Sequence, residues 1–131
     1  MRVGSMSFGA QELPFVPTSA ATARRLVARC ADSVGLGDLT HVAVLLTSEL
    51  VANALRHGRP PMVLACEGTG AGLRVSVSDG LAALPSLRRH GGLDEGGRGL
   101  AMVDVLANQW GSDLAPGGGK CVWFDLERSQ L

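Results

Sequence analysis

The order of the predicted elements indicates an α+β sandwich. Two helical segments come first, two strands joined by a glycine-rich turn follow, and a third helix and two further strands complete the chain. This order is typical of a two-layer α+β fold and differs from alternating βαβ units. The chain has 131 residues, 46% of them apolar, and no internal repeat, so one domain with its own core is expected over residues 1–131.

An N-terminal arm of residues 1–17 precedes the first helix. Residues 5–13 within it are expected to form a strand, which prolines end. Thr18 and Ser19 can cap the helix that follows, and Gly35 ends it. Its apolar stripe consists of Ala23, Leu26, Val27, Cys30 and Val34. The segment is therefore predicted to be an ordinary amphipathic helix.

The second helix, predicted over residues 38–57, carries polar residues on its apolar side. At 100° per residue, Glu49 and Asn53 lie about 40° apart. Both fall inside the stripe formed by Val42, Leu46 and Leu50. Burying a carboxylate without a partner is costly, so Glu49 needs a metal, a water-filled pocket or an ion pair.

Two interpretations of this pair stay open at this point. Glu49 could pair with an arginine such as Arg56 or Arg98, while Asn53 hydrogen-bonds a loop. Alternatively, both polar side chains line a ligand pocket. The far side of the helix is also apolar, which predicts packing against the first helix or a contact with a second copy or another partner. The apolar residues on that side are Val44, Val51 and Leu55.

A third polar residue is expected to face the same interior. Strands at 62–67 and 73–79 form a predicted hairpin through the turn at 68–72. The alternation that directs Leu73, Val75 and Val77 inward directs Asp79 inward as well. Asp79 could instead simply cap a turn with Gly80. Together with the polar pair on the second helix, it predicts a pocket.

The segment 80–97 is rich in glycine and too long for a tight connection, so it is a candidate lid. Glycines at 96–99 then open a helix predicted over 100–109, and backbone amides at a helix start suit a phosphate. That helix has Leu100, Val103, Leu106 and Ala107 as its stripe. Strands at 110–114 and 120–127 are expected to follow, as a second hairpin.

Composition excludes several classes of function. Twelve basic residues balance twelve acidic ones, so no broad charge favours nucleic acid or a membrane surface. No apolar stretch is long enough to span a bilayer and no signal peptide is recognisable, so a cytoplasmic protein is expected. The three cysteines and three histidines lack metal-ligand spacing, which predicts reduced core thiols.

Four segments taken in order resemble the GHKL ATPase domain, which has the Bergerat ATP-binding fold. They are residues 49–58 (Glu-Leu-Val-Ala-Asn-Ala-Leu-Arg-His-Gly), 77–80 (Val-Ser-Asp-Gly), 97–100 (Gly-Arg-Gly-Leu) and 118–123 (Gly-Gly-Lys-Cys-Val-Trp). The resemblance covers roughly residues 18–127 and is greatest to bacterial anti-sigma-factor serine kinases and stand-alone relatives. It implies a two-layer sandwich in which helices cover one face of a mixed, mostly antiparallel sheet.

The resemblance also implies a site for ATP and Mg²⁺. Asn53 would hold Mg²⁺, Glu49 would act as the base for an attacking hydroxyl, and Asp79 would accept the adenine amino group. Arg56 and His57 would adjoin the phosphates or the ribose. The remaining residues implied at the site are Gly97, Arg98, Gly99 and Leu100 around the phosphates, and Lys120 and Cys121 in the last segment.

Two departures from the family pattern concern the adenine end of the site. The chain lacks the second glycine common after Asp79 and Gly80, and it has Lys120 and Cys121 after Gly119 where a threonine is usual. The resemblance implies a bacterial regulator that sequesters a sigma factor and phosphorylates an antagonist protein. The alternative is a non-catalytic module in which ATP orders the lid and thereby sets partner affinity.

Overall fold

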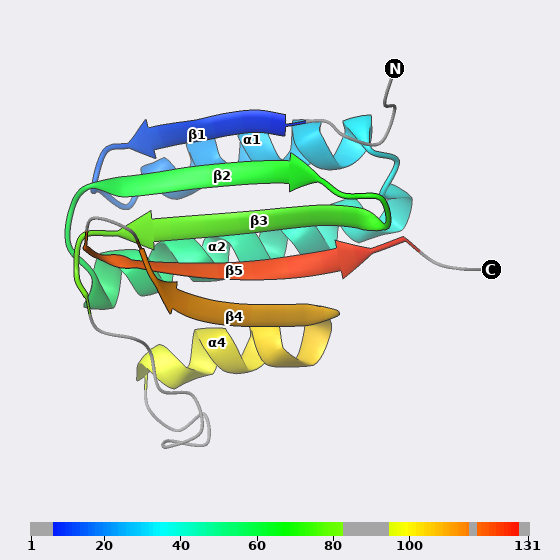
Figure 1. Cartoon of the computed structure of the whole chain (residues 1–131). Helices are drawn as coiled ribbons and strands as arrows, with labels where there is room; N and C mark the ends of the chain where they lie inside the picture. The colour runs from blue at the N-terminus through cyan, green and yellow to red at the C-terminus, as the bar shows by residue number, and fades with distance from the viewer. Residues whose placement is uncertain (1–6, 83–94, 116–117, 129–131) are drawn as a thin grey trace.

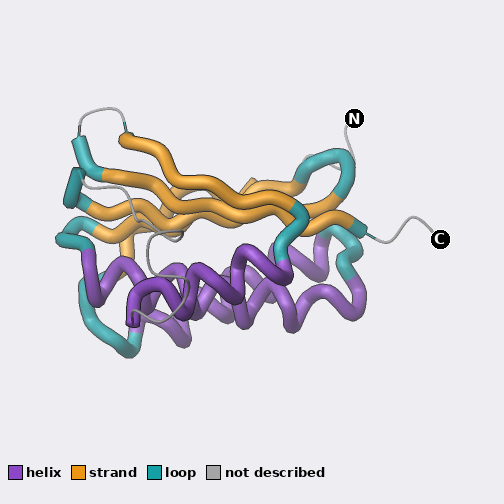
Figure 2. Tube along the Cα trace, turned by 90° about the horizontal axis from the view of Figure 1, so that it is seen from below, coloured by secondary structure: helices purple, strands orange, loops and turns teal. Residues whose placement is uncertain are grey.

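The computed structural model describes residues 7–82, 95–115 and 118–128, and it forms two layers. A five-stranded sheet makes one layer, and the helices cover one of its faces (Figures 1 and 2). The strands are β1 (Ser7–Leu13), β2 (Met62–Gly68), β3 (Gly72–Asp79), β4 (Gln109–Leu114) and β5 (Lys120–Glu127). The helices are α1 (Ser19–Ser33), the short 3₁₀ helix η1 (Gly37–Leu39), α2 (Thr40–His57) and α4 (Glu95–Leu106). The predicted α+β sandwich is confirmed.

The strand order is β1-β2-β3-β5-β4, and all four pairings of the described strands are antiparallel. The predicted hairpins, β2 with β3 and β4 with β5, are both present. The last strand, however, lies between β3 and β4, which local pattern does not reveal. This insertion places the start of β5 directly beside the end of β3, with Asp79 and Lys120 as register partners.

The core lies between the sheet and the helices, and the period of two along each strand decides which side chains enter it. The inward set on the three central strands is fully buried and consists of Met62, Leu64, Cys66, Leu73, Val75, Val77, Val122, Phe124 and Leu126. The polar residues Asp79 and Lys120 have the same parity as this set and are also buried. The inward direction predicted for Asp79 is therefore confirmed.

Helix α2 is the central helix of its layer, which explains why it is apolar almost all round. It packs against α1 on one side and α4 on the other, and its third side contacts β3. Val51, on the side away from Glu49, is fully buried, and Leu55 packs against the core. Packing against neighbouring helices thus occupies this surface. The helix begins at Thr40, after η1, two residues later than predicted.

The prediction for the third helix was wrong at both ends. Helix α4 begins at Glu95 and ends at Leu106, so the glycines at 96, 97 and 99 lie within it and do not precede it. Leu100 and Val103 are buried as expected, whereas Leu106 is exposed. Leu106 is exposed because it is the last residue of the helix, after which the chain turns into β4. Most of the predicted lid, residues 83–94, lies outside the described residues.

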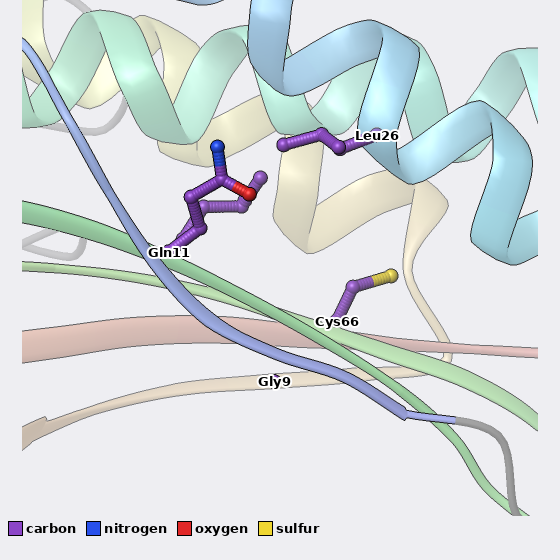
Figure 3. A pocket seen from close by; sticks show the side chains of 5 residues that line it. Gly9, Gln11, Leu26 and Cys66 are labelled. Carbon is purple, nitrogen blue, oxygen red and sulfur yellow. The ribbon is translucent and has the colours of Figure 1, made fainter.

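The three cysteines are free thiols, and the predicted core position holds for two of them. Cys30 of α1 and Cys66 of β2 are buried, and Cys121 is half-buried. The Cys66 thiol donates a hydrogen bond to Cys30, and this bond, together with burial, raises the pKa of the Cys66 thiol. A small pocket beneath β1 is lined by Gly9, Gln11, Leu26, Leu64 and Cys66 (Figure 3). None of these five residues is charged, and none belongs to the predicted ATP site.

Candidate functional site

A buried polar group is centred on Asp79, the last residue of β3. Its Oδ1 atom accepts a hydrogen bond from the backbone N–H of Leu81 at 2.8 Å and another from that of Arg59 at 3.4 Å. Its Oδ2 atom accepts a hydrogen bond from Lys120 Nζ at 2.6 Å. Asp79 therefore caps the turn that follows it, which is one of the two roles considered, and also forms a buried ion pair.

Lys120 reaches Asp79 because the two residues face each other across the β3–β5 pairing. Both side chains are only 2% exposed. The sequence does carry the signal for this direction, because Lys120, Val122, Phe124 and Leu126 follow the period of two that defines the core face. The pairing partner itself could not be read from that pattern.

Three glycines allow close backbone contacts at Asp79 and in the turn beside it. A Cβ atom at Gly58 would lie 2.4 Å from Asp79 Cγ, and one at Gly119 would lie 2.2 Å from the Asp79 carbonyl oxygen. A Cβ atom at Gly80 would lie 2.4 Å from the Pro60 carbonyl oxygen. Any side chain at these positions would collide with its neighbour, so the site is closely built from backbone on several sides.

Helix α2 carries the polar pair toward the same region. Gly58 follows its last residue and touches Asp79, and Asn53 lies five residues earlier, about 7.5 Å along the helix axis. Asn53 is 8% exposed, which confirms that it lies within the apolar stripe. Glu49 lies one further turn away and is half-buried. Arg56 and His57 are exposed on the last turn.

The start of α4 completes this end of the molecule. Helices α2 and α4 pack against each other, and Figure 1 shows the start of α4, the end of α2, the end of β3 and the start of β5 at the same end of the sandwich. The first amides of a helix have no intrahelical acceptor and carry its positive dipole end. In α4 these amides belong to residues 95–98, so they include the predicted phosphate-binding positions Gly97 and Arg98.

Cys121 is a predicted site residue that the structure directs elsewhere. It has the opposite parity to Lys120 and lies on the outer face of the sheet. Burial raises the pKa of the Cys121 thiol, and a hydrogen bond with Ser76 partly offsets this increase. The charged groups near the thiol are Asp113 and Arg74. These neighbours lie on β3 and β4 and not in the Asp79 group. Cys121 therefore does not contribute a side chain to that group.

This arrangement has the chemistry of a nucleotide site. It combines a buried hydrogen-bonding pair, helix-start amides that have no acceptor within the helix, and an amide side chain on a neighbouring helix. An Asn oxygen is a hard ligand of the kind Mg²⁺ takes together with phosphate oxygens, so Asn53 fits that ion. Within the described residues, no three side chains of His, Cys, Asp or Glu are grouped to hold a metal.

Fold and site together define an ATP-binding domain with helices on one face of an antiparallel sheet. A family model of the histidine kinase-like ATPase domain matches residues 13–126, nearly the whole chain. The protein belongs to this family, and the resemblance to GHKL ATPases is confirmed. No curated protein matches the chain. None of the helices in the described residues is long and apolar enough to cross a membrane.

Proposed function

We propose that this domain binds ATP with Mg²⁺ at the Asp79 end of the sandwich and transfers the γ-phosphoryl group to a serine or threonine of a partner protein. The observation that carries the proposal is the convergence of Asp79, Asn53 and the start of α4 at one end of the fold. Asp79 accepts the adenine amino group, and the first amides of α4 bind phosphate. Arg56 and His57 extend toward the same end from α2 and contribute positive charge or hydrogen bonds to the phosphates or the ribose.

Asn53 and Glu49 divide the remaining chemistry between them. The side-chain oxygen of Asn53 would hold Mg²⁺, and the ion would supply positive charge to neutralise the phosphates. The Glu49 carboxylate accepts the proton of the attacking hydroxyl, whose oxygen bonds to the γ-phosphorus as the bond to ADP breaks. Because they are one helical turn apart on one face of α2, the two groups serve the same phosphate.

The biological role we propose is that of a bacterial, cytoplasmic anti-sigma factor. The domain sequesters a sigma factor and phosphorylates an antagonist that would otherwise release it. Support comes from the segments 49–58, 77–80 and 97–100, which resemble those of anti-sigma-factor serine kinases. The segment 80–97 acts in this proposal as the lid over the nucleotide.

Nucleotide binding is tested by titrating the protein with ATP in the presence of Mg²⁺ in a calorimeter. We expect binding by the wild type and at least a tenfold loss in Asn53→Ala, because the metal ligand is removed. The matched control is Asn108→Ala, the other asparagine of the chain, whose Oδ1 accepts a hydrogen bond from the Glu127 amide. It should bind ATP like the wild type. A wild type that binds no ATP at millimolar concentration would contradict the proposal.

Phosphotransfer is tested with labelled ATP and the antagonist candidates encoded near the gene. The wild type should label a serine or threonine of one candidate, and Glu49→Gln should lose this labelling while still binding ATP. Glu67→Gln, at an exposed position of β2, is the control and should keep full activity. If ATP binds and no candidate is labelled, the protein is instead a non-catalytic module that ATP regulates.

A further inference from the structure

The buried lysine of the Asp79 group has no assigned task in nucleotide binding, and its chemistry points to one. Lys120 is the single lysine of the sequence, and its side chain is 2% exposed. Lysine is almost never fully buried unless it is paired. An ammonium group has three protons to donate, and among the described residues one acceptor, Asp79 Oδ2, is recorded for it. Within the described part of the chain the other two protons contact no acceptor, so they can be donated to an acceptor on a ligand.

Asp79 also keeps hydrogen-bonding capacity beside this ammonium. A carboxylate has about four acceptor positions. Leu81 and Arg59 use Oδ1, and Lys120 uses one position of Oδ2, so Oδ2 can accept one more hydrogen bond. The pair therefore presents an acceptor and a donor next to each other. The six-membered ring of adenine presents the complementary edge, with the 6-amino donor beside the N1 acceptor.

We propose that Lys120 is a base-reading residue that donates a hydrogen bond to N1 of adenine while Asp79 accepts one from the 6-amino group. This inference rests on the proposed ATP site. A 6-oxo purine presents the reverse order, an acceptor at position 6 and a donor at N1. The backbone amides of Arg59 and Leu81 hold Asp79 in place, so the two side chains cannot exchange positions to fit such a base. Lys120 thereby selects adenine over guanine and hypoxanthine.

Bare backbone packs closely around the pair. Gly58, Gly80 and Gly119 approach Asp79 or the turn beside it as bare backbone. Because the pair is covered in the structure, the atoms over it must move when a base enters. Desolvation then strengthens the hydrogen bond from the ammonium, since charge-assisted bonds are about twice as strong as neutral ones.

The first test uses the unmodified protein and three nucleotides with Mg²⁺: ATP, 1-deaza-ATP and 7-deaza-ATP. Replacing N1 by C–H removes the proposed acceptor, so 1-deaza-ATP should bind about tenfold more weakly than ATP or worse. 7-Deaza-ATP has the same size and keeps N1, and it should bind like ATP. Equal affinity for all three nucleotides would overturn the inference and leave the ATP site itself intact.

The second test uses the fact that Lys120 is the only lysine. Labelling with ¹⁵N-lysine gives one Nζ signal in an NMR spectrum, and ATP should shift this signal while 1-deaza-ATP shifts it much less. A bound ATP that leaves the signal unchanged would overturn the inference. This readout requires no substitution, so it is independent of whether variants of a buried ion pair fold.

A third test is a double-mutant cycle that combines a protein substitution with the change in the ligand. Lys120→Met should bind ATP about as weakly as the wild type binds 1-deaza-ATP, and it should no longer distinguish the two nucleotides. If Lys120→Met binds ATP more tightly than the wild type, the lysine blocks the base site and the inference is wrong. If the wild type binds none of the nucleotides, both the proposed function and this inference fail.

Discussion

At the scale of single residues, the position of the Asp79 carboxylate depends on the absence of a side chain at Gly58. Gly58 lies at the end of α2 with φ −103°, a conformation open to any residue, so its backbone angles do not require glycine. The requirement comes from the 2.4 Å separation between a Cβ atom at this position and Asp79 Cγ. Sequence alone identifies Gly58 only as a helix terminator, because its second role depends on the strand that packs against it.

We therefore expect Gly58→Ala to lower the free energy of unfolding by about 1–3 kcal/mol through overpacking. It should also weaken ATP binding, because Asp79 must move. Gly70→Ala is the matched control, since nothing lies within 4 Å of a Cβ atom there and its φ is not positive. That variant should stay within about 0.5 kcal/mol of the wild type. Urea unfolding measures both, and equal values for the two variants would contradict the assignment.

At the scale of elements, α4 shows how the end of a helix decides which apolar residues are buried. The periodicity that places Leu100 and Val103 in the core would also place Leu106 there. The helix ends at Leu106, however, and leaves this residue exposed. Met102 and Val105 are exposed as well, so α4 has a buried side against α2 and an apolar outer side.

Two valines on α4 provide a matched comparison of these sides. Val103 is fully buried, whereas Val105 is 77% exposed. Val103→Ala should lower the free energy of unfolding by about 1.5–3 kcal/mol, because it removes buried methyl groups and leaves a cavity. Val105→Ala should have an effect within about 0.5 kcal/mol, since alanine also favours the helix. Thermal unfolding of both variants checks this, and similar losses would show that the outer side of α4 is covered in solution.

At the scale of the whole molecule, the two ends of the sandwich differ in character. The end that carries Asp79, Lys120 and the start of α4 contains the buried ion pair. The opposite end holds the β2–β3 turn, in which the Thr69 N–H donates to the Gly72 carbonyl and the Gly72 N–H donates to Thr69 Oγ1. Arg128 also contacts this turn: its backbone N–H donates to the Ala71 carbonyl and its side chain donates to the Gly70 carbonyl.

Mg·ATP should therefore protect only one end from hydrogen exchange. We expect slower exchange at residues 56–60, 79–81 and 118–120, because a bound nucleotide orders and covers the backbone around Asp79. Residues 68–72 should exchange at the same rate with and without nucleotide. Mass spectrometry of peptic fragments resolves these segments. Protection confined to the β2–β3 turn would place the ligand at the wrong end and contradict the site.

The sequence by itself determined those features of the fold that depend on local periodicity. The alternation along residues 73–79 directed Asp79 inward, and the helical period directed Asn53 into the apolar stripe, as the structure confirms. The paired strands of both hairpins were predicted because tight glycine-rich turns join them. The ordered segments from Glu49 to Trp123 indicated the ATPase family, which the family model confirms.

Only the tertiary structure decided which of these elements meet. The insertion of β5 between β3 and β4 makes Asp79 and Lys120 partners, although 41 positions separate them in the chain. The pairing of strands that are distant in the sequence depends on the free energy of burying the whole sheet against the helices. No local sequence pattern indicates this free energy.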